Sequence, residues 1–329
     1  MAPHLPSRWT LCASSFNWAP EIIAARRSAA DIVTGIASTA AKTVELEPGL
    51  VWRSFPAPTG AEVDALREAL ALQGGSISIV GASLDDFTPP NRRRSVRERL
   101  DFLVPQFRAA ARVGAAGVRL SLGQAGPELL ALVQPLLHEL DLVLYEEIQG
   151  QQAPESPAVA PALEAIATLA DPRVRVLVDI SMLMPALPVT YLEELRMGGL
   201  PQDFLARLED GWQDPGTADA VLDLLRTGKV PPRVHTLFMN LLIRFGRSSA
   251  RDLAGILPLV GAFHLKFWDL DDDGGRVSQP LRDLGGLLSR NGFAGTLTSE
   301  WGGHEWLRDD PTDMTRRHLA LAEEALATA

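Results

Sequence analysis

The chain alternates, eight times over, between a short apolar or β-branched run and, in most cases, a longer amphipathic stretch. Such runs are typical of buried strands, and the longer stretches of helices that cover a sheet. Alternating strands and helices predict a parallel sheet, and eight repeats predict its closure into a (β/α)8 barrel, the TIM-barrel architecture of the α/β class. The expected strands span residues 9–14, 43–46, 76–80, 117–122, 142–147, 175–180, 261–268 and 295–300. The expected helices include 61–72, 96–113, 127–140, 161–170 and 280–289, with a final helix at 312–327.

An open, doubly wound sheet is the competing architecture. A dinucleotide-binding sheet of that kind would carry a glycine-rich turn directly after an early strand. The stretch Gly114-Ala115-Ala116-Gly117 instead precedes an expected strand, a position that suits the end of a helix and the loop after it. We therefore expect a single barrel domain over residues 1–329.

One connection breaks the rhythm of the repeats. From Asp179 to His264 the chain runs for 85 residues, whereas a step between strands through one helix needs roughly 30. We expect a helical insertion at residues 183–249, between the sixth and seventh strands, where it would leave from the catalytic face of the barrel. A lid or partner-docking role and a packing elaboration both remain open. Its expected helices span 191–197, 201–212, 218–225 and 232–244, and a further helix at 250–259 is assigned to the barrel.

The charge and composition exclude several classes of partner. The net charge is −10, the three lysines do not cluster, and the arginines form no basic stripe, so nucleic acid and anionic membranes are poor partners. The single cysteine, Cys12, cannot form an internal disulfide. Residues 1–8 contain no apolar signal-peptide segment, and no apolar run reaches the roughly 18 residues of a spanning helix. We expect a soluble, cytoplasmic protein.

Four metal-ligand side chains lie at or near the ends of the last four expected strands: Glu147, Asp179, His264 and Glu300. A carboxylate in such a place often caps a helix, but four such residues at one end of a barrel favour a shared site. Three carboxylates and an imidazole suit one divalent ion, Mn²⁺ first and Mg²⁺ or Co²⁺ as alternatives, better than structural zinc. The choice between Glu147 and Glu146 stays open, because neighbouring strand residues point to opposite faces.

Such a site suits chemistry next to a sugar carbonyl. A divalent metal chelated by the carbonyl and a neighbouring hydroxyl stabilises an enolate, and a nearby carboxylate removes the proton. The same enolate leads to epimerisation, isomerisation or loss of a β-substituent. Lys266 lies on the same strand face as His264 and either stabilises the developing oxyanion or pairs with an inward carboxylate such as Asp179 or Glu300.

Several residues in the loops after the strands are candidates for substrate contact. Trp18, Trp268 and Trp301 could form a wall for a sugar or an aglycone, and His304 is a weaker candidate, as is Glu45 at the end of the second strand. The acidic stretch at 269–275 lacks the ligand spacing and terminal glutamate of an EF-hand, so we expect an acidic turn there.

The segments around these ligands resemble the xylose-isomerase-like superfamily of divalent-metal barrels, which includes keto-sugar epimerases and inosose dehydratase. The resemblance spans most of the chain and implies that Glu147, Asp179, His264 and Glu300 bind the metal, with Glu147 and Glu300 as the acid/base pair. The long insertion and His264-Leu265-Lys266-Phe267 look most like the catalytic α-subunit of bacterial C-glycoside deglycosidases. The segments that carry the resemblance are Tyr145-Glu146-Glu147-Ile148-Gln149, Val178-Asp179-Ile180-Ser181, Phe263-His264-Leu265-Lys266-Phe267 and Ser299-Glu300-Trp301-Gly302-Gly303.

The chain departs from the epimerases of that superfamily at positions that contact sugars. Gln149 and Met182 stand where many members have histidine, and Trp268-Asp269-Leu270 stands where they have an arginine. The loss of polar sugar contacts in favour of Met182, Met184, Trp268 and Trp301 favours a more apolar ligand portion, such as an aromatic aglycone. Gln149 is a further candidate for substrate binding. We expect an enzyme that eliminates the aglycone from a 3-oxo-glycoside. The alternatives are a keto-sugar or inosose isomerase, epimerase or dehydratase, and a metal-poor barrel that serves as a binding or scaffold subunit.

The expected partners follow from the same resemblance. The substrate would be a small sugar or glycoside. C-glycoside deglycosidases combine this kind of subunit with a smaller β-rich one, so the resemblance implies a hetero-oligomer, with a homo-oligomer as the alternative.

Overall fold

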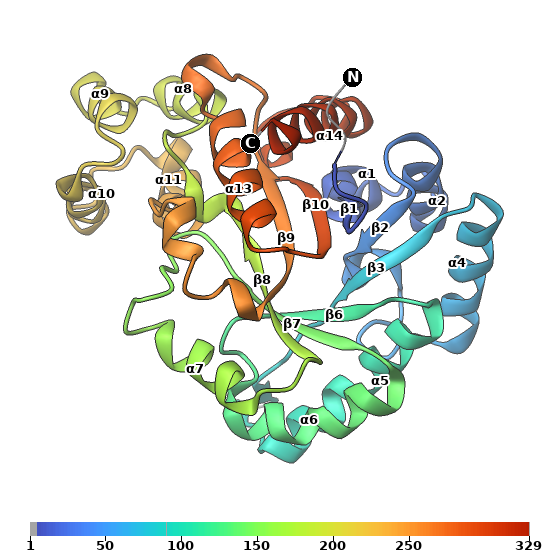
Figure 1. The fold of residues 1–329 in the computed structure, drawn as a ribbon. Coiled ribbons are helices and arrows are strands. Elements are labelled where there is room, and N and C mark those ends of the chain that lie inside the picture. Colours follow the sequence, from blue (N-terminus) through green and yellow to red (C-terminus); the bar gives the residue numbers. More distant parts are fainter. Residues whose placement is uncertain (1–4, 90, 329) are drawn as a thin grey trace.

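Eight parallel strands close into a barrel in the order β1-β10-β9-β8-β7-β6-β3-β2. The computed structural model describes residues 5–89 and 91–328. Helices surround the barrel and cover its outer face (Figure 1), which confirms the predicted (β/α)8 architecture. The strands are β1 (Trp9–Ser14), β2 (Thr43–Leu46), β3 (Ser76–Gly81), β6 (Gly117–Ser121), β7 (Val143–Ile148), β8 (Val174–Asp179), β9 (Val260–Phe267) and β10 (Gly295–Trp301).

The covering helices begin and end where the local sequence dictates. The longest begins after Ser95, whose hydroxyl accepts from the backbone of Glu98 while the Glu98 carboxylate accepts from the backbone N–H of Ser95. It ends at Gly114, which has a φ of 86° that favours glycine. Leu103 and Phe107 on its inner face are fully buried against the barrel. The covering helices are α2 (Ala29–Thr39), α4 (Gly60–Leu72), α5 (Val96–Val113), α6 (Gly126–Leu140), α7 (Ala160–Leu169), α13 (Ser278–Arg290) and α14 (Pro311–Ala327).

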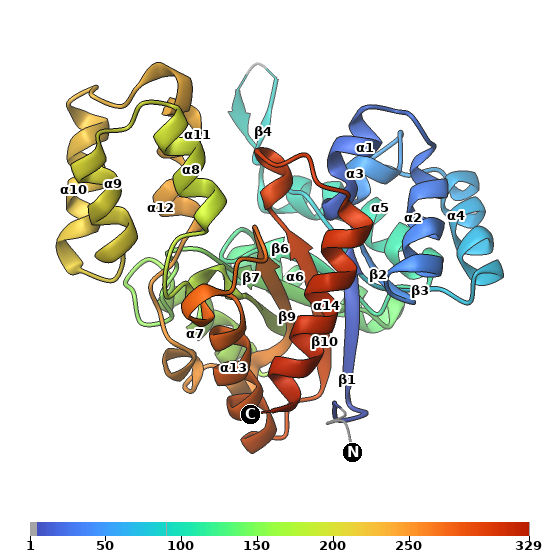
Figure 2. The same ribbon diagram turned by 90° about the horizontal axis from the view of Figure 1, so that it is seen from above.

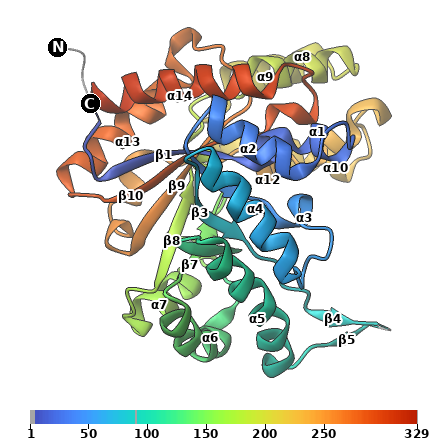
Figure 3. The ribbon, with the colours of Figure 1, turned by 90° about the vertical axis from the view of Figure 1, so that its right-hand side faces the viewer.

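Smaller elements lie in the loops after β1, β2 and β3. The helices α1 (Ala19–Ile23) and α3 (Pro48–Val51) follow the first two strands. An antiparallel hairpin of β4 (Phe87–Thr88) and β5 (Arg92–Arg93) follows β3. Figures 2 and 3 show this hairpin reaching well beyond the barrel strands.

The segment between β8 and β9 carries its own helices and its own core. The helices stand to one side of the barrel, away from α2 and α4 (Figure 2). Tyr191, Trp212 and Phe238 are among the buried residues of a separate apolar cluster, which also includes Trp268 from beyond β9. The description of residues 183–249 as an insertion stays a prediction. The helices are α8 (Val189–Met197), α9 (Gln202–Asp210), α10 (Pro215–Arg226), α11 (His235–Met239) and α12 (Leu241–Arg244).

Two of the helices predicted in this segment differ in detail from the observed structure. Residues 232–244 form a 3-10 turn followed by α11 and α12, with a break at Asn240. Residues 250–259 form two 3-10 turns, at Ala250–Leu253 and Leu257–Leu259, in place of one helix. Pro258 lacks the backbone N–H that a continuous helix over residues 250–259 would need at that position, which explains why this helix does not form. Across the described part of the chain, no helix combines the length and the apolar character that crossing a membrane requires.

Candidate metal centre

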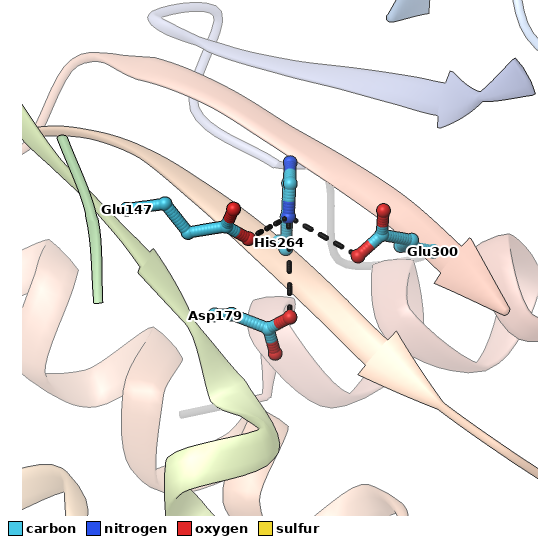
Figure 4. A group of neighbouring side chains, drawn as sticks. All are labelled: Glu147, Asp179, His264 and Glu300. Atoms are coloured by element: carbon cyan, nitrogen blue, oxygen red, sulfur yellow. Dashed lines mark ion pairs between the residues drawn. The ribbon is translucent and has the colours of Figure 1, made fainter. Parts of the chain in front are cut away.

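Four side chains from neighbouring strands converge at the carboxyl end of the barrel. The Nδ1 atom of His264 lies 2.9 Å from Glu147 Oε1, 3.2 Å from Glu300 Oε2 and 4.0 Å from Asp179 Oδ2. One potential ligand atom from each residue lies within 4.8 Å of the others, and all four residues are buried. Figure 4 shows the three carboxylates pointing toward the imidazole. The structure therefore brings together the four residues that the sequence grouped.

The alternation of side chains along β7 settles which glutamate faces the centre. The carboxylate of Glu146 accepts hydrogen bonds from the backbone N–H groups of Gly123 at 2.9 Å and Ala125 at 3.3 Å, in the loop before α6. Glu147 points to the opposite face and meets His264. Glu147 is therefore the member of the group, and Glu146 anchors a loop.

A hydrogen bond behind His264 fixes which ring nitrogen faces the carboxylates. The Nε2 atom lies 2.9 Å from Oε1 of Glu45, an acceptor with 1 % of its side chain exposed. We assign a proton to Nε2, which donates it to Glu45, so that Nδ1 is the ring nitrogen that faces the three carboxylates. A carboxylate behind a histidine is the arrangement that orients metal-binding imidazoles.

Among the described residues, two buried atoms of the group make no hydrogen bond of acceptable geometry: His264 Nδ1, despite its 2.9 Å distance to Glu147 Oε1, and Asp179 Oδ2. Unpaired buried polar atoms are costly, so native proteins usually provide a partner for them. A divalent cation among the four ligand atoms would satisfy both, and three carboxylates with one imidazole are donors that Mn²⁺, Mg²⁺ and Co²⁺ accept. The residues present therefore fit such an ion.

Arg119 on β6 supports the group from behind. Its Nη1 donates to Glu147 Oε2 at 2.6 Å, its Nε to Glu45 Oε1 at 3.1 Å, and its Nη2 to Glu47 Oε2 at 2.9 Å. Thr298 Oγ1 adds a hydrogen bond to the other oxygen of Glu45 at 3.0 Å. The guanidinium thus orients Glu147 and links it to two further glutamates.

The electrostatic field of the centre acts differently on its carboxylates. Burial alone would raise the pKa of Glu147, but Arg119 and His264 outweigh it and lower this pKa to about 2. For Asp179, burial dominates and raises the pKa to about 6. Burial would also lower the pKa of the His264 ring, yet Glu300, Glu45 and Glu147 raise it well above its ordinary value. The raised pKa of His264 shows that the surrounding carboxylates strongly favour a positive charge at this site.

Lys266 forms the ion pair that was one of its two predicted roles. Its Nζ lies 2.9 Å from Glu300 Oε2 and 5.0 Å from the centre of the Phe16 ring. Burial would lower the pKa of this amine, but Glu300 and Asp179 raise it above its usual range. The ammonium is therefore a fixed positive charge next to Glu300.

The six predicted substrate contacts occupy different environments. Trp18, Met182, Trp268 and Trp301 are at most 3 % exposed and pack inside the protein. Trp301 Nε1 donates to the backbone carbonyl of Trp268 at 2.7 Å, and Trp268 packs on Phe245 from the segment between β8 and β9.

The other two candidates lie beyond strand ends. Gln149 is exposed directly after β7. His304 is nearly buried, with its ring centre 4.6 Å from that of Phe16, and burial lowers its pKa to about 4. The assignment of all six residues to substrate binding stays a prediction.

Sequence reasoning missed Arg119 and Glu47. Arg119 is the one charged residue in the apolar run at 117–122, and that isolation was a usable signal, because a charge on a barrel strand requires buried partners. Glu47 lies one residue beyond the expected strand at 43–46, and nothing in the surrounding sequence marked it as a partner of the site.

Comparison with known proteins identifies sequence relatives of this chain. No family model matches the chain. It is 28 % identical over 294 residues to a C-glycoside deglycosidase alpha subunit of Arthrobacter globiformis, covering 87 % of this chain and 83 % of that protein. It is 25 % identical over 280 residues to a 3'-dehydrocarminate deglycosidase alpha subunit of a Microbacterium species, covering 80 % of this chain and 79 % of the relative.

Solved structures show the same architecture. D-psicose 3-epimerase superposes with a TM-score of 0.57 at 13 % identity, covering 97 % of this chain and 99 % of the epimerase. A xylose isomerase domain protein from Planctomyces limnophilus superposes with a TM-score of 0.52 at 14 % identity, covering all of both chains. The chain therefore has the xylose-isomerase-like TIM-barrel fold of sugar isomerases and epimerases, with C-glycoside deglycosidase alpha subunits among its sequence relatives.

Proposed function

We propose that this protein is a divalent-metal-dependent enzyme that removes the aglycone from a 3-oxo-glycoside by elimination. The observation that carries the proposal is the buried group of Glu147, Asp179, His264 and Glu300. Its atoms His264 Nδ1 and Asp179 Oδ2 make no hydrogen bond of acceptable geometry with another described residue. The names of the sequence relatives, which are deglycosidase alpha subunits, support the choice of substrate class.

The four residues of the group would hold the ion, with Mn²⁺ as the first expectation. When bound there, a divalent cation supplies Lewis acidity that polarises a sugar carbonyl. His264 is kept in the metal-binding tautomer by Glu45, and Glu147 is oriented by Arg119. These contacts hold the donors in place before the substrate arrives, which is the condition for efficient electrostatic catalysis.

Glu147 and Glu300 are the proposed acid/base pair. One carboxylate takes the proton from the carbon next to the carbonyl, and the electron pair of that C–H bond forms the enolate. The enolate returns the pair, a carbon–carbon double bond forms in the sugar, and the bond to the aglycone breaks. The aglycone leaves with that bonding pair and takes up a proton. Lys266, held beside Glu300, places positive charge near the oxygen on which negative charge develops.

The test compares two substrate classes on protein loaded with Mn²⁺. We expect release of the aglycone from a 3-oxo-C-glycoside and no conversion of free ketoses. Chromatography of both reaction mixtures measures the two outcomes. Conversion of ketoses without aglycone release would replace elimination by isomerisation or epimerisation. Protein that binds no metal and converts neither substrate would favour a scaffold role.

We also propose that a smaller partner subunit completes the enzyme. The relatives named above are alpha subunits by name. Met197, Met239 and Ile243, in the segment between β8 and β9, expose 57 %, 50 % and 69 % of their surface, and exposed apolar side chains suit a docking surface. Co-expression with a candidate β-rich subunit should raise turnover if the partner is required, and equal turnover of the isolated chain would argue against it.

A further inference from the structure

Glu47 is a carboxylate beside the metal centre that none of the roles above uses. It follows β2 directly, so strand alternation carries the inward face from Glu45 to Glu47, one step nearer the mouth of the barrel. Its backbone N–H donates to Ser15 Oγ at 2.8 Å, and its Oε2 accepts from Arg119 Nη2 at 2.9 Å. Both the backbone and the side chain of Glu47 are therefore fixed.

Glu47 does not act as a side-chain cap for the helix that follows it. Glu47 occupies the N-cap position of α3, where a carboxylate ordinarily accepts from the first turn of the helix. Its side chain makes no capping hydrogen bond. Within residues 5–89 and 91–328, the hydrogen bond to the carboxylate comes from Arg119, so helix capping does not explain its orientation.

The exposure of Glu47 separates it from the other carboxylates on Arg119. Its side chain is 33 % exposed, compared with 1 % for Glu45 and 5 % for Glu147. The two inner carboxylates are enclosed by the barrel, whereas Glu47 keeps part of its surface exposed just beyond the end of β2.

The neighbouring strand β3 leaves room for this side chain. A Cβ atom on Gly81, at the end of β3, would lie 2.8 Å from Glu47 Oε1, 3.3 Å from Pro48 Cδ and 3.4 Å from Arg119 Nη2. A larger residue at this position would push the carboxylate and the guanidinium out of register. The glycine thus permits Glu47 and Arg119 to lie where they do.

We propose that Glu47 is a substrate-binding residue that accepts hydrogen bonds from sugar hydroxyls, and that Arg119 is the positioning residue that sets its place relative to Glu147. Hydrogen bonds from hydroxyls to an ionised carboxylate are stronger than those between neutral groups. One guanidinium then couples recognition of the sugar to the orientation of a metal ligand. This inference rests on the proposed function, because it assigns part of the sugar specificity to the same site.

The test uses Glu47→Ala, the shape-conserving Glu47→Gln, and Glu164→Gln as a matched control on the exposed face of α7. With a 3-oxo-glycoside, KM should rise about 10- to 100-fold in Glu47→Ala, the range that a hydrogen bond to a charged group supports. Glu47→Gln should show a smaller rise, which also serves if the alanine variant does not fold. The loss of Mn²⁺ affinity should be smaller than the rise in KM in both variants, because the Glu47 side chain is bonded to Arg119 rather than directly to a ligand.

A series of monodeoxy substrates identifies the hydroxyl concerned. For the analogue that lacks it, wild type and Glu47→Ala should have the same KM. An unchanged KM in Glu47→Ala, or a rise matched by an equal loss of Mn²⁺ affinity, overturns the inference while the proposed function stands. If the wild type turns over no sugar derivative, the proposed function falls and this inference falls with it.

Discussion

Replacing Glu45 with glutamine tests how strongly the metal centre depends on residues behind it. Glu45 accepts three hydrogen bonds, from His264 Nε2 at 2.9 Å, Arg119 Nε at 3.1 Å and Thr298 Oγ1 at 3.0 Å. A glutamine of the same shape has one oxygen acceptor, so at least one donor faces an amide NH₂ group, and the charge that orients the His264 proton is lost. The substitution leaves the four ligand residues themselves unchanged.

Loss of such a supporting group typically weakens metal binding by 10- to 100-fold. We therefore expect the Kd for Mn²⁺ to rise by about that factor in Glu45→Gln, which corresponds to about 1.4 to 2.7 kcal/mol. Titration with Mn²⁺, followed by the electron paramagnetic resonance signal of the free ion, measures Kd directly. Glu164→Gln, a change on an exposed helix face, is the control and should leave Kd unchanged. An unchanged Kd in Glu45→Gln would refute the role assigned to this hydrogen-bond network.

Two further changes probe stability. Arg119→Met leaves Glu45 and Glu147 buried without their cation, so the free energy of unfolding should fall by about 3 to 5 kcal/mol in urea titrations; a change below about 1 kcal/mol would contradict this account. Burial lowers the pKa of His318 to about 3, whereas a histidine in the unfolded chain has a pKa of about 6.5. The neutral ring therefore stabilises the fold fully above about pH 6.5, and stability is lost as the pH falls from there toward 3, by roughly 2 kcal/mol at about pH 5. In His318→Phe, which keeps the stacking on Phe267, this part of the pH dependence should disappear, and a retained slope would assign it to other groups.

The barrel could be read from the sequence because its strands are locally distinct. All eight expected strands match the observed ones to within one residue at each end, since short apolar runs between amphipathic stretches need no knowledge of distant contacts. The four ligands could be grouped for the same reason, because parallel strands bring their carboxyl ends to one rim. The helix α2 and the hairpin of β4 and β5 were not anticipated.

The network behind the ligands could not be read in this way. Glu45, Arg119 and His264 come from β2, β6 and β9, and their contacts depend on how the closed barrel brings opposite walls together. Trp268 shows the same limit, because its position after β9 indicated the mouth while its side chain packs with Phe245 from another segment. Such contacts follow from the register of the whole barrel rather than from any single stretch of sequence.

The central claim is that one divalent ion binds among Glu147, Asp179, His264 and Glu300. The most direct measurement is a crystal structure of protein soaked in Mn²⁺, with data collected for anomalous scattering of manganese. We predict one anomalous peak within about 2.0 to 2.6 Å of an atom from each of the four residues. An empty site with the four side chains still converging, or a manganese peak elsewhere only, would contradict the account.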